Sequence, residues 1–272
     1  MDDETNESLR IWDGVAEGWE KYRDFINAAE SLITERLLDG LDARDGDAVL
    51  ELTAGPGSVG LLLAERRPNV RVLITDFAPH MVEAAERGAK ERGLTNVECR
   101  QMDAQAIDLP ESSVDGVFSR YGLMIPPDRA KTFSEIRRVL KPGRSLAYAV
   151  WGPIEANAWM MLMGAVLMQR GHFTPDPGGM PLATEDANRE VLGTAGFTEV
   201  QTEVLDAPMT YESFGQYWEV NGSVGGPVAE IIRNLPADER NAVRSAVEEF
   251  SAPFLSDAGL ALPASRVFVR AK

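Results

Sequence analysis

The sequence predicts an α/β fold in which a parallel sheet is covered by helices on both faces, the doubly wound arrangement. Between residues 48 and 151, short apolar runs bounded by turn residues alternate with amphipathic stretches at helical spacing. This alternation is typical of repeated βαβ units. With 272 residues, 44% of them hydrophobic, the chain is also long and apolar enough to bury a large core.

The first 40 residues predict two helices ahead of the sheet. Apolar side chains recur there every three or four positions, which places them on one face of a helix. They are Leu9, Trp12, Ala16 and Trp19 in the first stretch and Ile33, Leu37 and Leu38 in the second. We therefore expect residues 1–40 to form an N-terminal helical lid.

The central region predicts five strands and three helices. A proline at position 79 favours the start of a helix there. Pro142 and Gly143 favour the end of the helix expected over 127–140. The expected strands are 48–53, 70–75, 97–102, 114–119 and 145–151, and the expected helices are 57–67, 79–93 and 127–140.

The regular alternation stops after residue 151. Residues 152–184 predict an insertion with a Pro/Gly-rich loop at Thr174–Pro181, followed by a helix over 184–195 and a strand over 197–205. Residues 210–255 show mostly helical spacing, and 262–271 end in a further strand. We therefore expect a core over 41–206 containing the insertion, a helical cap over 207–261, and the last core strand in 262–272.

Composition and charge exclude several classes of protein. The net charge of −16 repels phosphate backbones, so no nucleic-acid partner is expected. The single cysteine, Cys99, excludes an internal disulfide and a thiolate zinc cluster, and we expect no metal. The longest apolar run, Ala158–Met168, is too short to span a bilayer, and the acidic N-terminus does not resemble a signal peptide. These features predict a cytoplasmic protein without a membrane span.

A glycine-rich turn after the first expected strand is the sharpest motif. Gly55, Gly57 and Gly60 match the dinucleotide pattern G-x-G-x-x-G, which makes an NAD(P)-dependent oxidoreductase one candidate. Acidic residues follow or end three neighbouring strands, and in a doubly wound sheet they would meet at the carboxyl edge. They are Glu51, Asp76 and Asp103.

These carboxylates disfavour a pyrophosphate ligand. Two like charges about 4 Å apart repel by on the order of 4 kcal/mol at an effective dielectric constant near 20. Pro56 also removes one N–H donor from the turn. S-adenosylmethionine instead carries a sulfonium, an ammonium, ribose hydroxyls and an adenine amine, all of which interact favourably with carboxylates.

Five motifs in order resemble those of class I S-adenosylmethionine-dependent methyltransferases, most closely the small-molecule branch that includes ubiquinone and menaquinone biosynthesis enzymes. The motifs are 49–57, 74–81, 102–104, 109–115 and 136–143. The resemblance covers about residues 40–152. It implies a Rossmann-like, seven-stranded sheet whose last strand is antiparallel. It also implies S-adenosyl-L-methionine as the cofactor, which is converted to S-adenosyl-L-homocysteine when the methyl group is transferred.

The resemblance also implies a role for each matching residue. It places Glu51 and the turn residues Thr53, Ala54, Gly55 and Gly57 beside the methionine portion of the cofactor, with the Ser119 carbonyl on the ammonium group. Asp76 would hold the ribose hydroxyls. Phe77 and Met81 would lie against the adenine, and Asp103 and Ala104 would contact its edge. Similar enzymes usually have glycine where Thr53 stands. We therefore expect no unusual backbone conformation at that position, and an altered approach of the amino-acid tail of the cofactor.

Methyl transfer from a sulfonium is an in-line displacement, so positioning supplies most of the acceleration and a general base is optional. Tyr121 and His172 are the weak catalytic candidates, whereas His80 stands at the adenine end and is expected to serve the helix terminus. Flanking aromatic residues are expected to form a lid or a wall of the acceptor pocket. They are Trp12, Trp19, Tyr22, Tyr121, Tyr217 and Trp218.

The favoured function is therefore an S-adenosylmethionine-dependent methyltransferase acting on a small molecule. The alternatives are the NAD(P)-dependent oxidoreductase and a non-catalytic module that binds S-adenosylmethionine. The sequence leaves open the acceptor, the methylated atom, the pathway and the oligomeric state.

Overall fold

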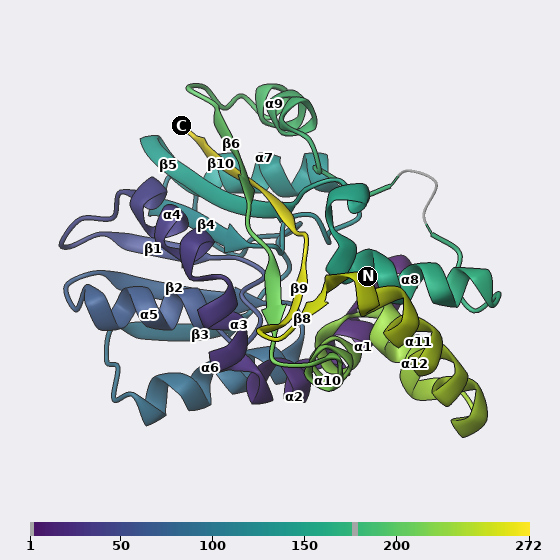
Figure 1. Cartoon of the computed structure of the whole chain (residues 1–272). Helices are drawn as coiled ribbons and strands as arrows, with labels where there is room; N and C mark the ends of the chain where they lie inside the picture. Colours follow the sequence, from purple (N-terminus) through teal and green to yellow (C-terminus); the bar gives the residue numbers. More distant parts are fainter. Residues whose placement is uncertain (1–2, 176–178) are drawn as a thin grey trace.

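A seven-stranded sheet forms the centre of the computed structural model, which describes residues 3–175 and 179–272 (Figure 1). The strand order is β3-β2-β1-β4-β5-β10-β6. The strands are β1 (Ala48–Glu51), β2 (Arg71–Asp76), β3 (Val97–Gln101), β4 (Val114–Arg120), β5 (Leu140–Trp151), β6 (Gln201–Asp206) and β10 (Ser265–Ala271). Strands β1 to β5 pair in parallel, and β10 is antiparallel to both β5 and β6. The predicted fold class and the antiparallel last strand are confirmed.

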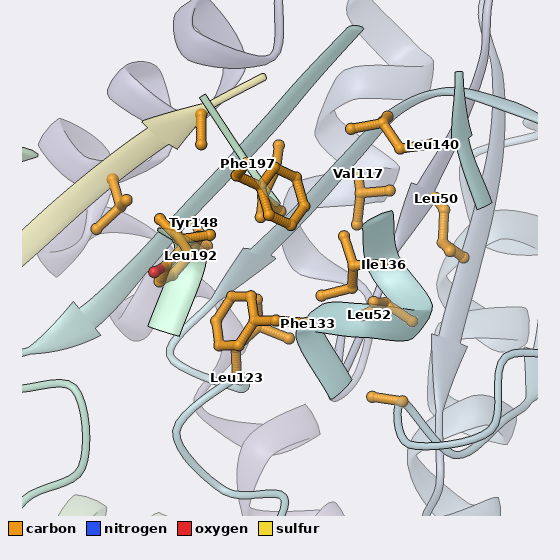
Figure 2. Close-up of a cluster of buried hydrophobic side chains, with 14 of the residues drawn as sticks. Leu50, Leu52, Val117, Leu123, Phe133, Ile136, Leu140, Tyr148, Leu192 and Phe197 are labelled. Atoms are coloured by element: carbon orange, nitrogen blue, oxygen red, sulfur yellow. The ribbon is translucent and has the colours of Figure 1, made fainter. Parts of the chain in front are cut away.

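Helices cover both faces of this sheet because successive strand residues point to opposite sides. Val49 packs on one face with α4 (Ser31–Leu41), α5 (Ser58–Arg66) and α6 (Pro79–Glu91). Leu50 packs on the other face, where Phe133 and Ile136 of α7 (Arg129–Val139) and Leu192 of α9 (Glu185–Thr194) complete the cluster. Figure 2 shows this second cluster, with side chains from strands and helices meeting in one apolar layer.

The bounds of the core elements differ from the predicted ones mainly at β5. That strand begins at Leu140 rather than Ser145, because Leu140 pairs with Val114 ahead of a register shift in the β4–β5 ladder. Helix α7 begins at Arg129, where the Asp128 carboxylate accepts a hydrogen bond from the Lys131 backbone N–H at 2.9 Å. Such side-chain caps fix helix ends that periodicity alone leaves uncertain.

Four helices precede the sheet, so the expectation of two was wrong. They are α1 (Asp3–Asp13), α2 (Ala16–Lys21), α3 (Arg23–Ala29) and α4. Between them, Tyr22 (φ −98°, ψ 16°) and Glu30 (φ −105°, ψ 19°) leave helical geometry. The apolar spacing continues across these breaks, which hides them from a periodicity argument.

The segment after β5 and the cap combine helices with a small second sheet. The insertion contains the short 3₁₀ turn Ile154–Ala156 and α8 (Ala158–Gln169), and residues 176–178 of the expected Pro/Gly-rich loop lie outside the described residues. The cap contains α10 (Phe214–Val224), α11 (Pro227–Asn234), α12 (Ala237–Ser251) and a 3₁₀ turn at Ala252–Phe254.

The small sheet has the order β7-β9-β8 and was not predicted. Its strands are β7 (Met209–Tyr211), β8 (Leu255–Ser256) and β9 (Gly259–Leu262). Each has four residues or fewer, too short for an alternation signal.

Among the described residues, none of the helices combines the length and apolarity needed to cross a bilayer.

A buried hydrogen bond between β5 and α9 gives a test of this packing. The Tyr148 hydroxyl donates to Asn188 Oδ1 at 2.7 Å, and both side chains are fully buried. Tyr148→Phe leaves that oxygen without this donor, so we expect the free energy of unfolding to fall by about 1–3 kcal/mol in urea denaturation. An unchanged unfolding midpoint would contradict the assigned packing of α9 on β5.

Candidate active site

The candidate site lies where the carboxyl ends of β1, β2 and β4 meet the loop after β3. The turn between β1 and α5 carries two glycines in the left-handed region, Gly55 at φ 56° and Gly57 at φ 73°. A Cβ placed on Gly55 would find its nearest neighbour, Met81 Sδ, only at 3.9 Å. The backbone at Gly55 therefore faces open space that a ligand can approach.

Asp76, the last residue of β2, holds this turn in place. Its Oδ2 accepts from the Gly55 N–H at 2.8 Å, and its Oδ1 accepts from the Ala78 N–H at 2.9 Å. The side chain is 6% exposed, and burial raises its pKa to about 6, although the backbone donors act to lower it. Each carboxylate oxygen keeps a second lone pair that a ribose hydroxyl can use.

Glu51, at the end of β1, points toward α5 instead of the open side of the turn. Its Oε2 accepts from the Gly60 N–H at 2.9 Å, and a Cβ on Gly60 would lie 2.3 Å from that oxygen. Burial raises its pKa to about 8, against the lowering effects of Arg120 and the Gly60 N–H. Because the folded state holds this proton more tightly than the unfolded chain does, the stability that protonated Glu51 contributes is lost as pH rises from the ordinary pKa of 4.5 to about 8, and it changes no further above that pH.

Thr53 occupies the position where similar enzymes usually have glycine, and its backbone is left-handed at φ 51°. The expectation that Thr53 lacks an unusual backbone conformation is therefore wrong: this β-branched residue adopts a conformation that glycine adopts without strain. Its hydroxyl donates to the Leu52 carbonyl at 2.5 Å and lies 2.9 Å from Ser119 Oγ of β4. Gly122 makes room for it, because a Cβ there would lie 1.8 Å from Thr53 Oγ1.

A small cleft of about 20 Å³ brings several predicted cofactor residues together. Its lining includes the predicted residues Thr53, Phe77, Asp103 and Ala104, and residues that were not predicted, namely Ser8, Gln105, Ile125, Pro126 and Pro127. The loop after β4 could have been found from the rule that loops at one sheet edge share a site. Ser8, on α1, gave no signal of this kind.

The remaining predicted cofactor residues do not line this cleft. Met81 is buried beside Phe77 and Trp12. Ala54 donates its N–H to the Thr75 carbonyl at 2.9 Å and accepts from the Gly57 N–H at 3.1 Å. Asp103 accepts from the Gln105 N–H at 2.8 Å. All three acidic residues thus accept from backbone N–H groups, but only Asp103 lines the cleft.

Five of the six predicted lid or pocket aromatics, all except Tyr121, lie in the N-terminal helices and the cap and pack in the clusters there. Trp12 and Trp19 contact the cluster that contains Phe77, and Trp19 Nε1 donates to the Val224 carbonyl at 3.1 Å. Tyr22 and Trp218 pack against the cap cluster, which includes Tyr217. The Tyr217 hydroxyl donates to the Trp159 carbonyl at 2.8 Å.

The two weak catalytic candidates lie in different surroundings. Tyr121 follows β4 at φ 65°, stacked on Trp151, and its hydroxyl hydrogen-bonds Glu30. His172 bonds through Nε2 to Glu239 of α12 at 2.7 Å. His80, expected at a helix end, lies there, and its Nδ1 is 2.6 Å from Asp13 Oδ2.

Comparisons with known proteins identify relatives of this chain. Residues 49–143 match the family described as Methyltransferase domain. Demethylmenaquinone methyltransferase of Thermus thermophilus is 37% identical over 111 residues, which are 41% of this chain and 50% of that enzyme. Malonyl-[acyl-carrier protein] O-methyltransferase of a Paenibacillus species is 27% identical over 188 residues, 68% of this chain and 67% of that enzyme. The chain thus aligns with about half to two thirds of these relatives.

A solved structure supports the fold. The YcgJ protein of Bacillus subtilis superposes with a TM-score of 0.61 at 18% identity, covering 88% of this chain and 96% of that one. At this identity the likeness concerns the fold alone.

The contact between Thr53 and Gly122 predicts a substitution pair. Gly122→Ala forces a methyl group onto the Thr53 side chain, so we expect it to cost about 1–3 kcal/mol of unfolding free energy in urea denaturation. Adding Thr53→Gly removes the side chain that the methyl group meets, so it should restore part of the lost stability. The rescue should be incomplete, because the backbone carbonyl oxygen of residue 53 still lies 2.8 Å from the new methyl position. Equal instability of the single and double variants would show that the two residues are not in contact.

The pKa of Asp76 predicts how ligand affinity depends on pH. If ribose hydroxyls donate to the ionised carboxylate, S-adenosylhomocysteine should bind about tenfold more weakly for each pH unit below about 6 and level off above it. Calorimetric titrations between about pH 5 and pH 7.5 measure this dependence. Asp76→Asn is the matched control and should bind weakly with a flat profile. A wild-type affinity that does not change over this range would exclude Asp76 from the ligand contact.

Proposed function

We propose that residues 49–143, which match the family described as Methyltransferase domain, form a domain of the class I S-adenosylmethionine-dependent type, and that the protein methylates a small-molecule acceptor. The observation that carries the proposal is the Gly55 turn, open to a ligand and fixed by Asp76, beside a cleft lined by Phe77 and Asp103. The net charge of −16 favours a small molecule over nucleic acid as the acceptor.

The residues at the sheet edge fit S-adenosylmethionine better than a dinucleotide. Asp76 would hold the ribose hydroxyls, Phe77 and Met81 the adenine face, and Asp103 and Ala104 the adenine edge. The turn from Thr53 to Gly57 and the Ser119 carbonyl would hold the methionine portion. Pro56 offers no N–H to a pyrophosphate, and the carboxyl groups nearby would repel it. When bound, the cofactor supplies an electrophilic methyl group on a sulfonium.

The cleft must widen before the cofactor enters. A volume of about 20 Å³ holds a single water, whereas ligand sites typically measure about 300–1,000 Å³. Ser8 is the one lining residue from the N-terminal helices, and the others belong to the sheet core and its loops. We infer that α1 moves away to admit the cofactor and returns to exclude water, which gives the N-terminal segment the role of a lid.

The chain accelerates transfer mainly by alignment. Holding the acceptor atom in line with the methyl group can contribute roughly 7–11 kcal/mol to the reduction of the barrier. The rigid turn supports this, because Asp76 and Thr53 tie it to β2 and β4 through side-chain hydrogen bonds. Strand ends fixed in this way hold a ligand more narrowly than a free loop would.

The acceptor we propose is a flat, largely apolar ring. Three aromatic side chains gather beyond the ends of β4 and β5, namely Tyr121, Trp151 and Trp159 of α8. Each is partly exposed. Tyr121 directly precedes Gly122, against which Thr53 packs. One relative is named for a quinone substrate, demethylmenaquinone, and that chemistry suits such a surface.

A labelled-methyl assay tests this function. With S-adenosylmethionine carrying a radioactive methyl group, we expect label in 1,4-naphthohydroquinone, a flat bicyclic acceptor, and none in a malonyl thioester. Asp76→Ala should raise the cofactor KM at least about tenfold through loss of hydrogen bonds to a charged group, while His80→Ala, at an exposed helix end, should leave turnover nearly intact.

The other outcomes separate the parts of the proposal. Label in the thioester alone would exclude the flat acceptor but keep the methyltransferase. A melting temperature raised by NAD and not by S-adenosylhomocysteine would exclude the methyltransferase itself.

A further inference from the structure

A buried ion pair joins the N-terminal helices to the last strand. Glu30, between α3 and α4, and Arg266 of β10 are 2% and 3% exposed. Arg266 Nη2 donates to Glu30 Oε1 at 2.7 Å and Nε donates to Oε2 at 2.9 Å, a two-pronged contact between residues 236 positions apart. Arg266 Nη1 also donates to the Ala207 carbonyl at 2.6 Å. Burying two charges is costly, so a pair in this position calls for an explanation beyond stability.

The third member of the network is Tyr121. Its hydroxyl donates to Glu30 Oε2, and Arg266 Nε donates to the same hydroxyl at 3.1 Å. Its backbone is left-handed at φ 65°, which is a rare conformation for an aromatic residue. Strain of this kind persists where surrounding contacts hold it, and it is concentrated at functional sites.

These contacts make the Tyr121 hydroxyl unsuitable for proton transfer. Both its donor and its acceptor capacity are used within the network. Burial and the negative charge of Glu30 raise the pKa of Tyr121 well above its ordinary value. Burial alone would lower the pKa of Arg266, but the bonds and charge of Glu30 raise it, so the guanidinium stays charged.

The ring of Tyr121, in contrast, extends the aromatic surface at the sheet edge. It stacks on Trp151 with centroids 4.1 Å apart and planes at 10°, and Trp151 meets Trp159 at 4.7 Å and 55°. The Arg266 guanidinium lies 5.1 Å from the Trp151 ring centroid. One ion pair therefore contacts two of the three rings.

We propose that Glu30 and Arg266 are positioning residues that hold the Tyr121 ring against Trp151, so that the rings form a fixed wall for a flat acceptor. The inference rests on the proposed function and goes beyond it by giving Tyr121 a stacking role through its ring. It also links the N-terminal helices to the acceptor side of the site, since Glu30 lies between α3 and α4.

The test measures binding of 1,4-naphthoquinone by quenching of tryptophan fluorescence, with S-adenosylhomocysteine at saturation. Tyr121→Leu removes the ring, and we expect about tenfold weaker naphthoquinone binding, near the upper value of an aromatic pair. Tyr121→Phe keeps the ring and should weaken binding less, by about two- to fourfold. Glu30→Gln should weaken binding about three- to tenfold in the wild-type background.

The deciding comparison is a double-mutant cycle. If Glu30 acts through the ring, Glu30→Gln should change naphthoquinone affinity by less than about twofold once Tyr121→Leu is present. A fall of the same size in both backgrounds would overturn the proposal, as would unchanged affinity in Tyr121→Leu. Because a lone buried charge can unfold the protein, the paired variant Glu30→Leu with Arg266→Met provides a second measurement, and it should show the same dependence on the Tyr121 ring.

The cofactor titration keeps the two proposals apart. S-adenosylhomocysteine should bind Tyr121→Leu with wild-type affinity, because the ring contacts the acceptor alone. Absence of S-adenosylhomocysteine binding in the wild-type protein would overturn the proposed function. If S-adenosylhomocysteine binds normally but Tyr121→Leu has the same naphthoquinone affinity as the wild-type protein, only this inference is overturned.

Discussion

The Asp76 carboxylate is the contact on which the site depends. By accepting from Gly55 and Ala78 together, it fixes the glycine turn after β1 to the start of α6. Two adjacent βα units therefore share one carboxylate, and the open face of Gly55 keeps a constant position relative to Phe77. Without this tie, the Gly55 N–H would lose its acceptor, and the turn would be held less firmly for the alignment that an in-line displacement needs.

Much of the core followed from the sequence because its signals are local. The alternation of strands and helices, the proline at the start of a helix and the glycines of the turns are each recognised from a few neighbouring residues. The structure places the predicted core strands and helices within a few residues of their expected bounds. The breaks in the N-terminal helices at Tyr22 and Glu30 were missed, because Glu30 is bonded to Arg266, more than two hundred residues away. The very short strands of the second sheet carry too few residues for any pattern.

The sequence placed several candidate residues at one edge of the sheet, but it did not show their electrostatics. The positions of Asp76 and Asp103 at one edge agree with parallel-strand geometry, but the sequence argument treated Glu51 as a third charge beside the ligand. Burial instead raises its pKa to about 8, and its carboxyl group serves the Gly60 N–H. Burial decides the charge of a carboxyl group, and a sequence does not report burial residue by residue. Whether Asp76 and the turn hold the cofactor remains a prediction.

The most direct measurement is a crystal structure grown with S-adenosylhomocysteine. We expect the ribose oxygens within about 2.6–3.2 Å of the Asp76 carboxylate, the adenine between Phe77 and Asp103, and Ser8 displaced from the cleft. Density for the ligand elsewhere, with no oxygen of the ligand near the Asp76 carboxylate, would contradict the assignment of the site.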